Sequence, residues 1–330
     1  MTERARPNIV EALRDLPAGE HIVTIGTFDG VHRGHAHLIA QVTARAEALG
    51  LPTLVVTFEP VPAQVLRPER FAGRLCSASN KGHLLAEHAV DTIAVLPFTH
   101  KLSQLEPETF MARLMRHASS REVWVGEAFA LGRNRTGNVD RLTEIGQELG
   151  YRLVAVPRLT DEHLVISSSM IRQQIASGRP EEAARGLGRW FRIEGEVIHG
   201  AHVGRTIGFP TANILPPAEI VPLPDGIYAT FAVLPDRPGR LPAMTYIGTR
   251  PALNTGARLI ETHILDFDED IYGVWIGVDF VSHLRGDADF SGVDALVAQL
   301  REDEVATRAV LRQVREEPAP SLASVSLTSY

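Results

Sequence analysis

The chain has 330 residues, enough for two ordinary domains that each bury a core of their own. Hydrophobic residues make up 44% and charged residues 22%, which is typical of a soluble globular protein. The formal net charge of -7 argues against a broad surface for nucleic acid or anionic membrane. We therefore expect small-molecule partners, with neither nucleic acid nor membrane among them.

The single cysteine, Cys76, excludes an internal disulfide and any zinc site built from several thiolates. The N-terminal residues mix charges throughout and lack the apolar core of a signal peptide. No stretch approaches the roughly 18 apolar residues needed to span a bilayer. These features predict a cytoplasmic protein, and they leave self-association open.

Only two residues are lysines, Lys81 and Lys101, and neither lies in a Walker-type phosphate loop. No G-x-G-x-x-G follows the first expected strand either. If the protein binds nucleotides, its phosphate-binding groups must be histidine, arginine, hydroxyls and backbone amides.

The first half alternates short apolar runs with amphipathic segments. Strands are expected at residues 21–28, 51–60, 91–99, 121–129 and 151–159, and helices at residues 35–50, 107–119 and 139–150. This alternation predicts a parallel sheet with helical crossovers, an α/β Rossmann-like domain.

The second half begins with a serine-capped helix at 166–178 and a helical connector at 179–190, and then becomes β-like. Strands are expected at residues 191–200, 226–234, 243–250, 257–267 and 271–284, followed by a helix at 291–314. Short strands without intervening helices predict a small antiparallel β-barrel closed by a C-terminal helix. We predict domains at 1–184 and 185–315, and a flexible tail at 316–330.

The sequence "TFDGVHRGH" joins the first strand to the first helix. Ligands of open α/β sheets gather at this edge, where helix amides favour anions. His32 and His35 can donate hydrogen bonds to phosphate oxygens and stabilise charge in a transition state. A metal site that adds His37 and Asp29 is a weaker alternative.

These residues resemble the H-x-G-H signature of the nucleotidyltransferase superfamily, in a setting similar to that of bacterial bifunctional riboflavin kinase/FMN adenylyltransferases. That superfamily has a second phosphate-binding element, I-S-S-T-x-I-R, at the start of a later helix. This chain has "ISSSMIR" at residues 166–172. The resemblance implies that its serines and Arg172 bind ATP phosphates.

The sequence "GRTIGFPTAN" at residues 204–213 resembles the riboflavin kinase motif. The resemblance implies that Thr211 and Asn213 serve Mg²⁺ and ATP, since both offer the hard oxygen ligands that magnesium prefers. It also implies that Glu261, two residues before a histidine, is the catalytic base. On an extended strand Glu261 alternates away from Ile260 and Ile264, so it can face a polar cleft.

The catalytic residues implied in this way are His32, His35 and Glu261. The ATP-binding residues implied are Gly26, Phe28, Asp29, Gly34, Ser167, Ser168, Ser169, Arg172, Gly204, Arg205, Gly208, Thr211 and Asn213, with Thr211 and Asn213 also as metal ligands. An acidic run from Asp266 to Asp270 has calcium-like spacing, although a hairpin turn is favoured.

The resemblance implies two reactions, phosphorylation of riboflavin to FMN by the second domain and adenylylation of FMN to FAD by the first. The first domain departs from the family at Glu59, Val61, Ala128 and Leu131, where it usually has aspartate, histidine, a polar side chain and an aromatic one. Three hypotheses therefore stay open: a bifunctional enzyme, a kinase with a weakened first domain, and a flavin- or nucleotide-binding regulator without turnover.

Overall fold

The computed structural model describes residues 6–161, 164–200, 203–249 and 258–316. Their contacts divide the chain into two compact units. The first unit comprises Met1–Ala72 and Ser77–Ser168, and the second comprises Gly73–Cys76 and Ser169–Tyr330. The predicted domain limits at residues 184 and 185 stay a prediction, and residues 317–330 of the predicted tail lie outside the described residues.

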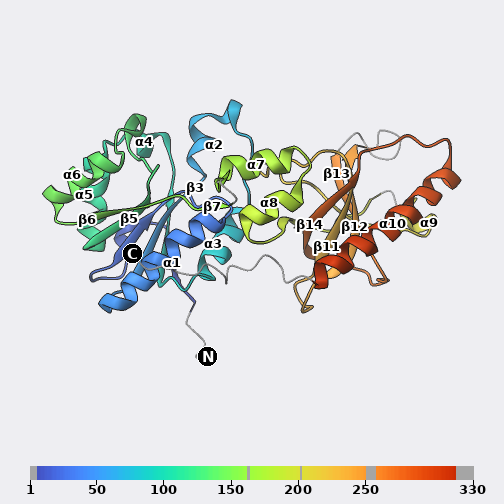
Figure 1. Ribbon diagram of the computed structural model, residues 1–330, viewed down its shortest axis with the longest axis horizontal. Helices are drawn as coiled ribbons and strands as arrows, with labels where there is room; N and C mark the ends of the chain where they lie inside the picture. Colours follow the sequence, from blue (N-terminus) through green and yellow to red (C-terminus); the bar gives the residue numbers. More distant parts are fainter. Residues whose placement is uncertain (1–5, 162–163, 201–202, 250–257, 317–330) are drawn as a thin grey trace. The chain divides into compact units, whose positions relative to one another are not determined.

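The first unit is an α/β fold around a six-stranded sheet (Figure 1). Its elements in chain order are β1 (Asn8–Val10), η1 (Leu13–Asp15), β2 (Ile22–Ile25), α1 (Arg33–Leu49), β3 (Thr53–Glu59), α2 (Pro62–Leu66), η2 (Pro68–Arg70), α3 (Ala78–Ala86), β4 (Thr92–Pro97), α4 (His100–Ser103), α5 (Pro107–Ala118), β5 (Glu122–Gly126), η3 (Arg133–Arg135), α6 (Val139–Leu149), β6 (Arg152–Val156), β7 (Thr160–Asp161) and β8 (Leu164–Val165).

The sheet has the order β1-β4-β3-β2-β5-β6, and every pairing in it is parallel. All five expected strands are present, so the predicted Rossmann-like parallel sheet is confirmed. From β2 the chain moves outward through β3 and β4, then returns to place β5 on the other side of β2. The order thus reverses beside β2, and ligands of open α/β sheets bind at such a reversal point.

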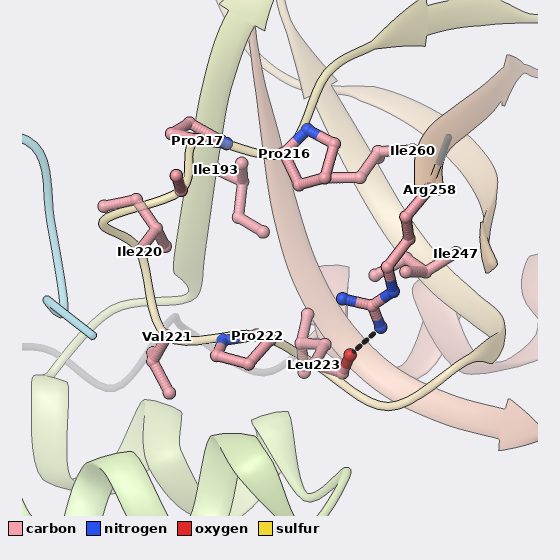
Figure 2. A pocket seen from close by; sticks show the side chains of 11 residues that line it. Ile193, Pro216, Pro217, Ile220, Val221, Pro222, Leu223, Ile247, Arg258 and Ile260 are labelled. Carbon is pink, nitrogen blue, oxygen red and sulfur yellow. Dashed lines mark hydrogen bonds between the residues drawn. The ribbon is translucent and has the colours of Figure 1, made fainter. Parts of the chain in front are cut away.

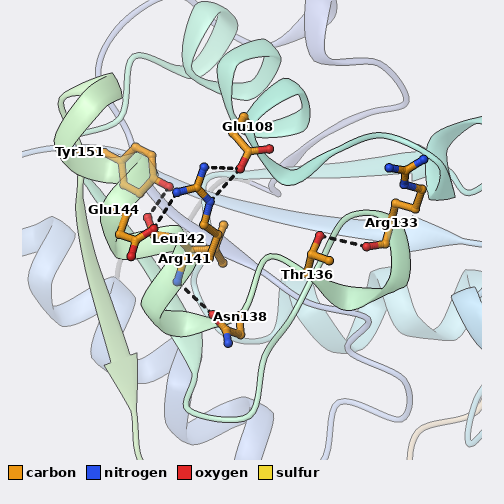
Figure 3. Close-up of polar contacts among 8 residues, drawn as sticks. All are labelled: Glu108, Arg133, Thr136, Asn138, Arg141, Leu142, Glu144 and Tyr151. Carbon is orange, nitrogen blue, oxygen red and sulfur yellow. Dashed lines mark hydrogen bonds and ion pairs between the residues drawn. The ribbon is translucent and has the colours of Figure 1, made fainter.

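Residues with known capping preferences mark the ends of helices α1 and α6. Gly50 and Gly150 close α1 and α6 with φ of 65° and 80°, the left-handed conformation that glycine adopts without steric cost. Asn138 caps the start of α6 through its side chain. Arg141 then links α6 to α5, because it donates to Glu108 at 2.8 Å (Figure 3).

The second unit is a small antiparallel barrel. Its elements are α7 (Ser168–Ala176), which begins at the division between the units, α8 (Pro180–Leu187), β9 (Phe191–Glu196), α9 (Val203–Thr206), β10 (Ala212–Ile214), β11 (Gly226–Val233), β12 (Leu241–Thr249), β13 (Arg258–Ile264), β14 (Trp275–Arg285) and α10 (Val293–Glu316).

The barrel strands run in the order β10-β13-β12-β11-β14-β9. The two edges meet because Ile198, just beyond β9, bridges Asn213 of β10. Helix α10 packs along the barrel through Leu300 and Leu311 (Figure 1), and Arg285 of β14 pairs with the buried Asp303 of α10 at 2.7 Å. The predicted β-barrel with a C-terminal helix is confirmed.

Short elements escaped the sequence analysis. They are β1, α2, α4, α9, β10, the β7–β8 pair and the 3-10 helices η1, η2 and η3, and at two to five residues they are too short to show a hydrophobic period. Helix α3 is longer and was also missed. In the described part of the chain, no helix is both long and apolar enough to cross a membrane.

One ion pair connects α1 to the sheet beside the reversal point. Glu122 of β5 is almost buried, and Arg45 of α1 binds both of its carboxylate oxygens at 2.8 and 3.1 Å. Trp124 donates a further hydrogen bond to Glu122 at 3.1 Å. Hydrogen bonds from Arg45 lower the pKa of the Glu122 carboxyl from its ordinary value.

We expect Arg45→Met to destabilise the first unit at pH 7 by about 1 kcal/mol, because the almost buried carboxylate loses its cation. The lowered pKa means that the ionised Glu122 contributes stability above the unfolded pKa of about 4.3. That contribution is lost as the pH falls through the lowered folded value, so the difference between variant and wild type should shrink near pH 3. Denaturant unfolding at both pH values measures it.

The control is Glu47→Gln, on the exposed face of the same helix, which should change stability little at either pH. A difference between Arg45→Met and wild type that is the same at pH 7 and pH 3 would contradict the assignment.

Candidate active sites

The turn after β2 has an unusual backbone. Phe28, Gly30 and Val31 have φ of 48°, 76° and 37°, in the left-handed region that non-glycine residues rarely adopt. Such conformations persist only where the surroundings impose them, and they concentrate at functional sites. The turn lies at the carboxyl end of β2, beside the point where the sheet order reverses.

His32 and His35 are packed together at the start of α1. Their rings stack with centroids 3.6 Å apart and planes 16° apart. His32 is the N-cap of the helix, and its Nδ1 accepts the backbone N–H of His35 at 3.3 Å. Because Nδ1 is the acceptor, a neutral His32 carries its proton on Nε2, the nitrogen that can donate to an anion.

Two glycines allow close packing around these rings. A Cβ on Gly34 would lie 3.1 Å from His32 Cε1 and 3.5 Å from the carbonyl oxygen of Ile166. A Cβ on Gly26 would lie 2.9 Å from the ring of Phe28, which contacts the ring of His35 edge-on at 5.2 Å. Both glycines therefore serve the placement of the histidines.

Part of the predicted serine element reaches this turn. Ser168, at the start of α7, donates to the carbonyl of the buried Asp29 at 3.2 Å, and Ser167 directly precedes it. Arg33 pairs with Asp161 of β7 at 2.5 Å. The H-x-G-H turn and the chain leading into α7 thus meet within the first unit.

The rest of that element belongs to the second unit. Ser169 is exposed, and Arg172 donates to the carbonyl of Gly73 at 2.7 Å within that unit. The roles of Ser169 and Arg172 in binding phosphate stay predictions.

The four departures from the family pattern have definite places. Val61 is buried directly before α2, and Leu131 pairs with Gly137 through the backbone and packs on the core. Ala128 accepts a hydrogen bond through its carbonyl from Arg135 at 3.4 Å, in the loop that leads to α6. Glu59 forms an ion pair with Lys81 at 2.6 Å.

Lys81 also lies at this edge, and the sequence analysis gave it no role in a site. It lies on α3 with 1% of its side chain exposed, close to the carboxyl ends of β2 and β3. The available signal was the serine at position 77, which caps α3 and precedes an apolar pair, Leu84 and Leu85.

In the barrel, strand register aligns two predicted residues. Asn213 of β10 is directly opposite Glu261 of β13, and Glu261 is opposite Tyr246 of β12. Directly opposed residues share one face of a sheet, with Cβ atoms about 4.5–5.5 Å apart. The fully buried Ile260 and Thr262 flank the half-buried Glu261, as the predicted alternation requires.

The segment before β10 is tightly folded. A Cβ on Gly204 would collide with the carbonyl oxygen of Phe209, and Gly208 has a φ of 86°. His263 of β13 is 2.7 Å from the carbonyl oxygen of Pro210 through its Nδ1. These contacts hold the segment against the strand that carries Glu261.

A cleft of about 440 Å³ lies beside this segment. Two predicted ATP-binding residues, Arg205 and Thr211, line it together with Asp268, Glu269 and Asp270. Glu261 and Asn213 are not among its lining residues, while Thr262 and Ala212 from the other face of those strands are. Thr211 is therefore the link between the cleft and the Asn213–Glu261 pair.

A second, smaller cavity of about 190 Å³ is mainly apolar. Figure 2 shows Pro216, Pro217 and Pro222 around it, with Arg258 hydrogen-bonded to the carbonyl of Leu223. None of the predicted site residues lines this cavity. Across the described ranges, no group of three or more His, Cys, Asp or Glu side chains is arranged to hold a metal ion.

Two families of known proteins match different parts of the chain, one in each half. The sequence model of FAD synthetase matches residues 16–170, and that of riboflavin kinase matches residues 187–311. A bifunctional riboflavin kinase/FMN adenylyltransferase of Escherichia coli (strain K12) is 33% identical, covering 91% of this chain and 95% of the relative. The protein of the same name from Pseudomonas fluorescens is 35% identical, covering 88% and 92%.

A solved structure is also similar. The crystal structure of a protein described as a macrolide-efflux protein from Streptococcus pneumoniae has a TM-score of 0.81 at 28% identity, covering 92% of this chain and 99% of that one. Its name differs from those of the sequence relatives, which agree with one another and with both family models. The chain belongs to the bifunctional riboflavin kinase/FMN adenylyltransferase family.

Proposed function

We propose that the chain makes FAD in two steps, one in each unit. The second unit transfers the γ-phosphoryl group of ATP to riboflavin, giving FMN and ADP. The first unit transfers AMP from a second ATP to FMN, giving FAD and pyrophosphate. Among the three hypotheses, the bifunctional enzyme is the one supported by two family models that each match one half of the chain.

The observation that carries the proposal is that each unit holds its own set of phosphate-binding candidates. In the first unit these are the stacked imidazoles and helix amides at the carboxyl edge of the sheet. In the second unit they are Thr211 and Arg205 in the cleft, beside the aligned Asn213 and Glu261. Two independent sites suit two successive reactions with ATP.

In the kinase step Glu261 is the base. Its carboxylate accepts the proton of the terminal ribityl hydroxyl as that oxygen attacks the γ-phosphorus and ADP leaves. Such a base contributes about 10²–10⁴ in rate, and positioning with charge stabilisation supplies most of the rest. Glu261 is half-buried, and the strand register puts Asn213 directly opposite it.

Thr211, which lines the cleft, and the neighbouring Asn213 offer oxygen donors that fit Mg²⁺. The Thr211 hydroxyl and the Asn213 amide oxygen are neutral hard ligands of the kind that magnesium accepts while it keeps several waters. Asn213 is buried, and its Nδ2 is 3.4 Å from the carbonyl oxygen of Thr211, which leaves Oδ1 as the amide's acceptor. When bound there, Mg²⁺ would neutralise charge on the ATP phosphates.

In the adenylyl step no covalent enzyme intermediate is needed. An oxygen of the FMN phosphate attacks the α-phosphorus of ATP, and pyrophosphate leaves. His32 and His35 donate hydrogen bonds to the phosphate oxygens on which charge develops, and Gly34 lets the chain approach them.

We further propose that the enzyme acts in the cytoplasm, where ATP is available, and that it can self-associate.

Replacing Glu261 by Gln should lower riboflavin phosphorylation by about 100-fold or more, because the amide cannot accept the proton. Conversion of supplied FMN to FAD should continue at the wild-type rate. Both are measured by chromatography of the flavins. Glu302→Gln, on the exposed side of α10, is the matched control. Normal FMN formation by Glu261→Gln would show that another group is the base.

Replacing His35 by Asn should slow the conversion of FMN to FAD by about 100-fold, the usual cost of removing one donor to a developing anion. His37→Asn is the control, because His37 lies on the same helix but its Nε2 is 2.8 Å from Gln41 Nε2 and it has no role in the proposed step. Riboflavin phosphorylation should be unchanged in both variants. Equal loss of FAD formation in the two variants would assign the effect to the helix rather than to the His35 ring.

Replacing Thr211 by Ala should raise the Mg²⁺ concentration needed for half-maximal FMN formation by about tenfold, because one oxygen ligand is lost. A magnesium titration of the kinase rate measures it, with Thr206→Ala as the control. An unchanged titration curve together with a lowered maximal rate would assign Thr211 to ATP and not to the metal.

A further inference from the structure

Lys81 has a setting that the mechanism above does not use. Its ammonium group, on α3, donates to Glu59 Oε1 at 2.6 Å, to the Phe58 carbonyl at 2.9 Å and to the Thr27 carbonyl at 3.4 Å. Three oxygens match the three protons of an ammonium group. A lysine so deeply buried is uncommon unless it is paired.

The two carbonyls lie at the ends of two adjacent strands. Thr27 comes just after β2, whereas Phe58 and Glu59 end β3. Lys81 therefore joins the carboxyl ends of β2 and β3 at the edge where the histidine turn begins. Thr57 of β3 donates to the same Thr27 carbonyl at 3.0 Å, so this oxygen is held by two side chains.

A fixed Thr27 carbonyl also restrains the next residue, Phe28. The peptide bond is planar, so the Thr27 carbonyl and the Phe28 N–H move as one rigid group. Phe28 has a φ of 48°, and its ring contacts His35 edge-on at 5.2 Å. A rotation of the Thr27–Phe28 peptide would therefore displace the ring against which His35 packs.

We propose that Lys81 is a positioning residue for the adenylyl-transfer site. By joining the ends of β2 and β3 it holds the Thr27–Phe28 peptide, and through Phe28 it holds the His35 ring in the place where it meets the phosphates of ATP. The inference rests on the proposed function of the first unit. It assigns to Lys81 no contact with substrate.

The test has to separate this role from ordinary stabilisation. Removing Lys81 alone would leave the Glu59 carboxylate, 17% exposed, without its cation, which is destabilising. Removing both charges together, as Lys81→Met with Glu59→Met, replaces the pair by apolar side chains of similar size, and such exchanges are often neutral in stability. The double variant then lacks the Glu59 carboxylate and the two hydrogen bonds from Lys81 to the Thr27 and Phe58 carbonyls.

For the double variant we expect the kcat of FMN adenylylation to fall at least about tenfold, with little change in the KM for FMN. The reason is that a displaced His35 ring no longer meets the phosphate oxygens on which charge develops in the transition state. Riboflavin phosphorylation, in the second unit of the same chain, should keep its rate and reports that the protein is folded. Glu59→Gln, which keeps an oxygen acceptor for Lys81, should stay within about threefold of wild type. Lys101→Met is the control at the exposed lysine.

A double variant with wild-type kcat overturns the proposal, and so does a Glu59→Gln variant that loses as much kcat as the double variant, since the carboxylate would then be the active group. If the double variant does not fold, Lys81→Met combined with Glu59→Gln decides, because it removes the ammonium group, leaves no unpaired charge and keeps a polar side chain at residue 59. This variant should lower the adenylylation kcat at least about tenfold with an unchanged kinase rate, and a wild-type kcat overturns the proposal. Absence of FAD formation by the wild-type chain would instead refute the proposed function.

Discussion

Backbone pairing between strands is the interaction on which both sites depend. In the first unit, parallel pairing puts β2 where the strand order reverses, so the turn after β2 opens at the edge of the sheet where ligands bind. In the second unit, antiparallel register sets Asn213 opposite Glu261. A slip of one residue would move Glu261 to the face now held by Thr262. In the first unit, contacts between the site residues add to this pairing, because the His32 and His35 rings stack and the His35 ring packs against Phe28.

Much of the fold was predictable, because most strands lie within short apolar runs, and helices α1 and α6 are amphipathic and end at glycines. The motif residues were found for a different reason: His32, Gly34 and His35 lie close together in the sequence, so their spacing alone brings them together. Long-range pairing could not be predicted in this way. Tyr246 is a neighbour of Glu261 only through the register of β12 and β13, and Lys81 reaches Thr27 only through the fold.

The structure shows what the residues that depart from the family pattern contact. Glu59 has a structural role, because its carboxylate forms an ion pair with the buried Lys81. Val61 is buried, and Leu131 packs against the hydrophobic core of the first unit. Ala128 has an apolar side chain, and its backbone carbonyl accepts a hydrogen bond from Arg135. The effect of residue 128 on a substrate stays a prediction of the family resemblance.

The central claim is that one chain carries two separate ATP-dependent reactions in sequence. The most direct measurement is a time course of the wild-type protein with riboflavin, ATP and magnesium, in which the flavins are separated and pyrophosphate is counted. The account predicts that FMN appears first and then declines as FAD rises, with one pyrophosphate released for each FAD. Riboflavin that stays unchanged, or FMN that accumulates without FAD or pyrophosphate, would contradict it.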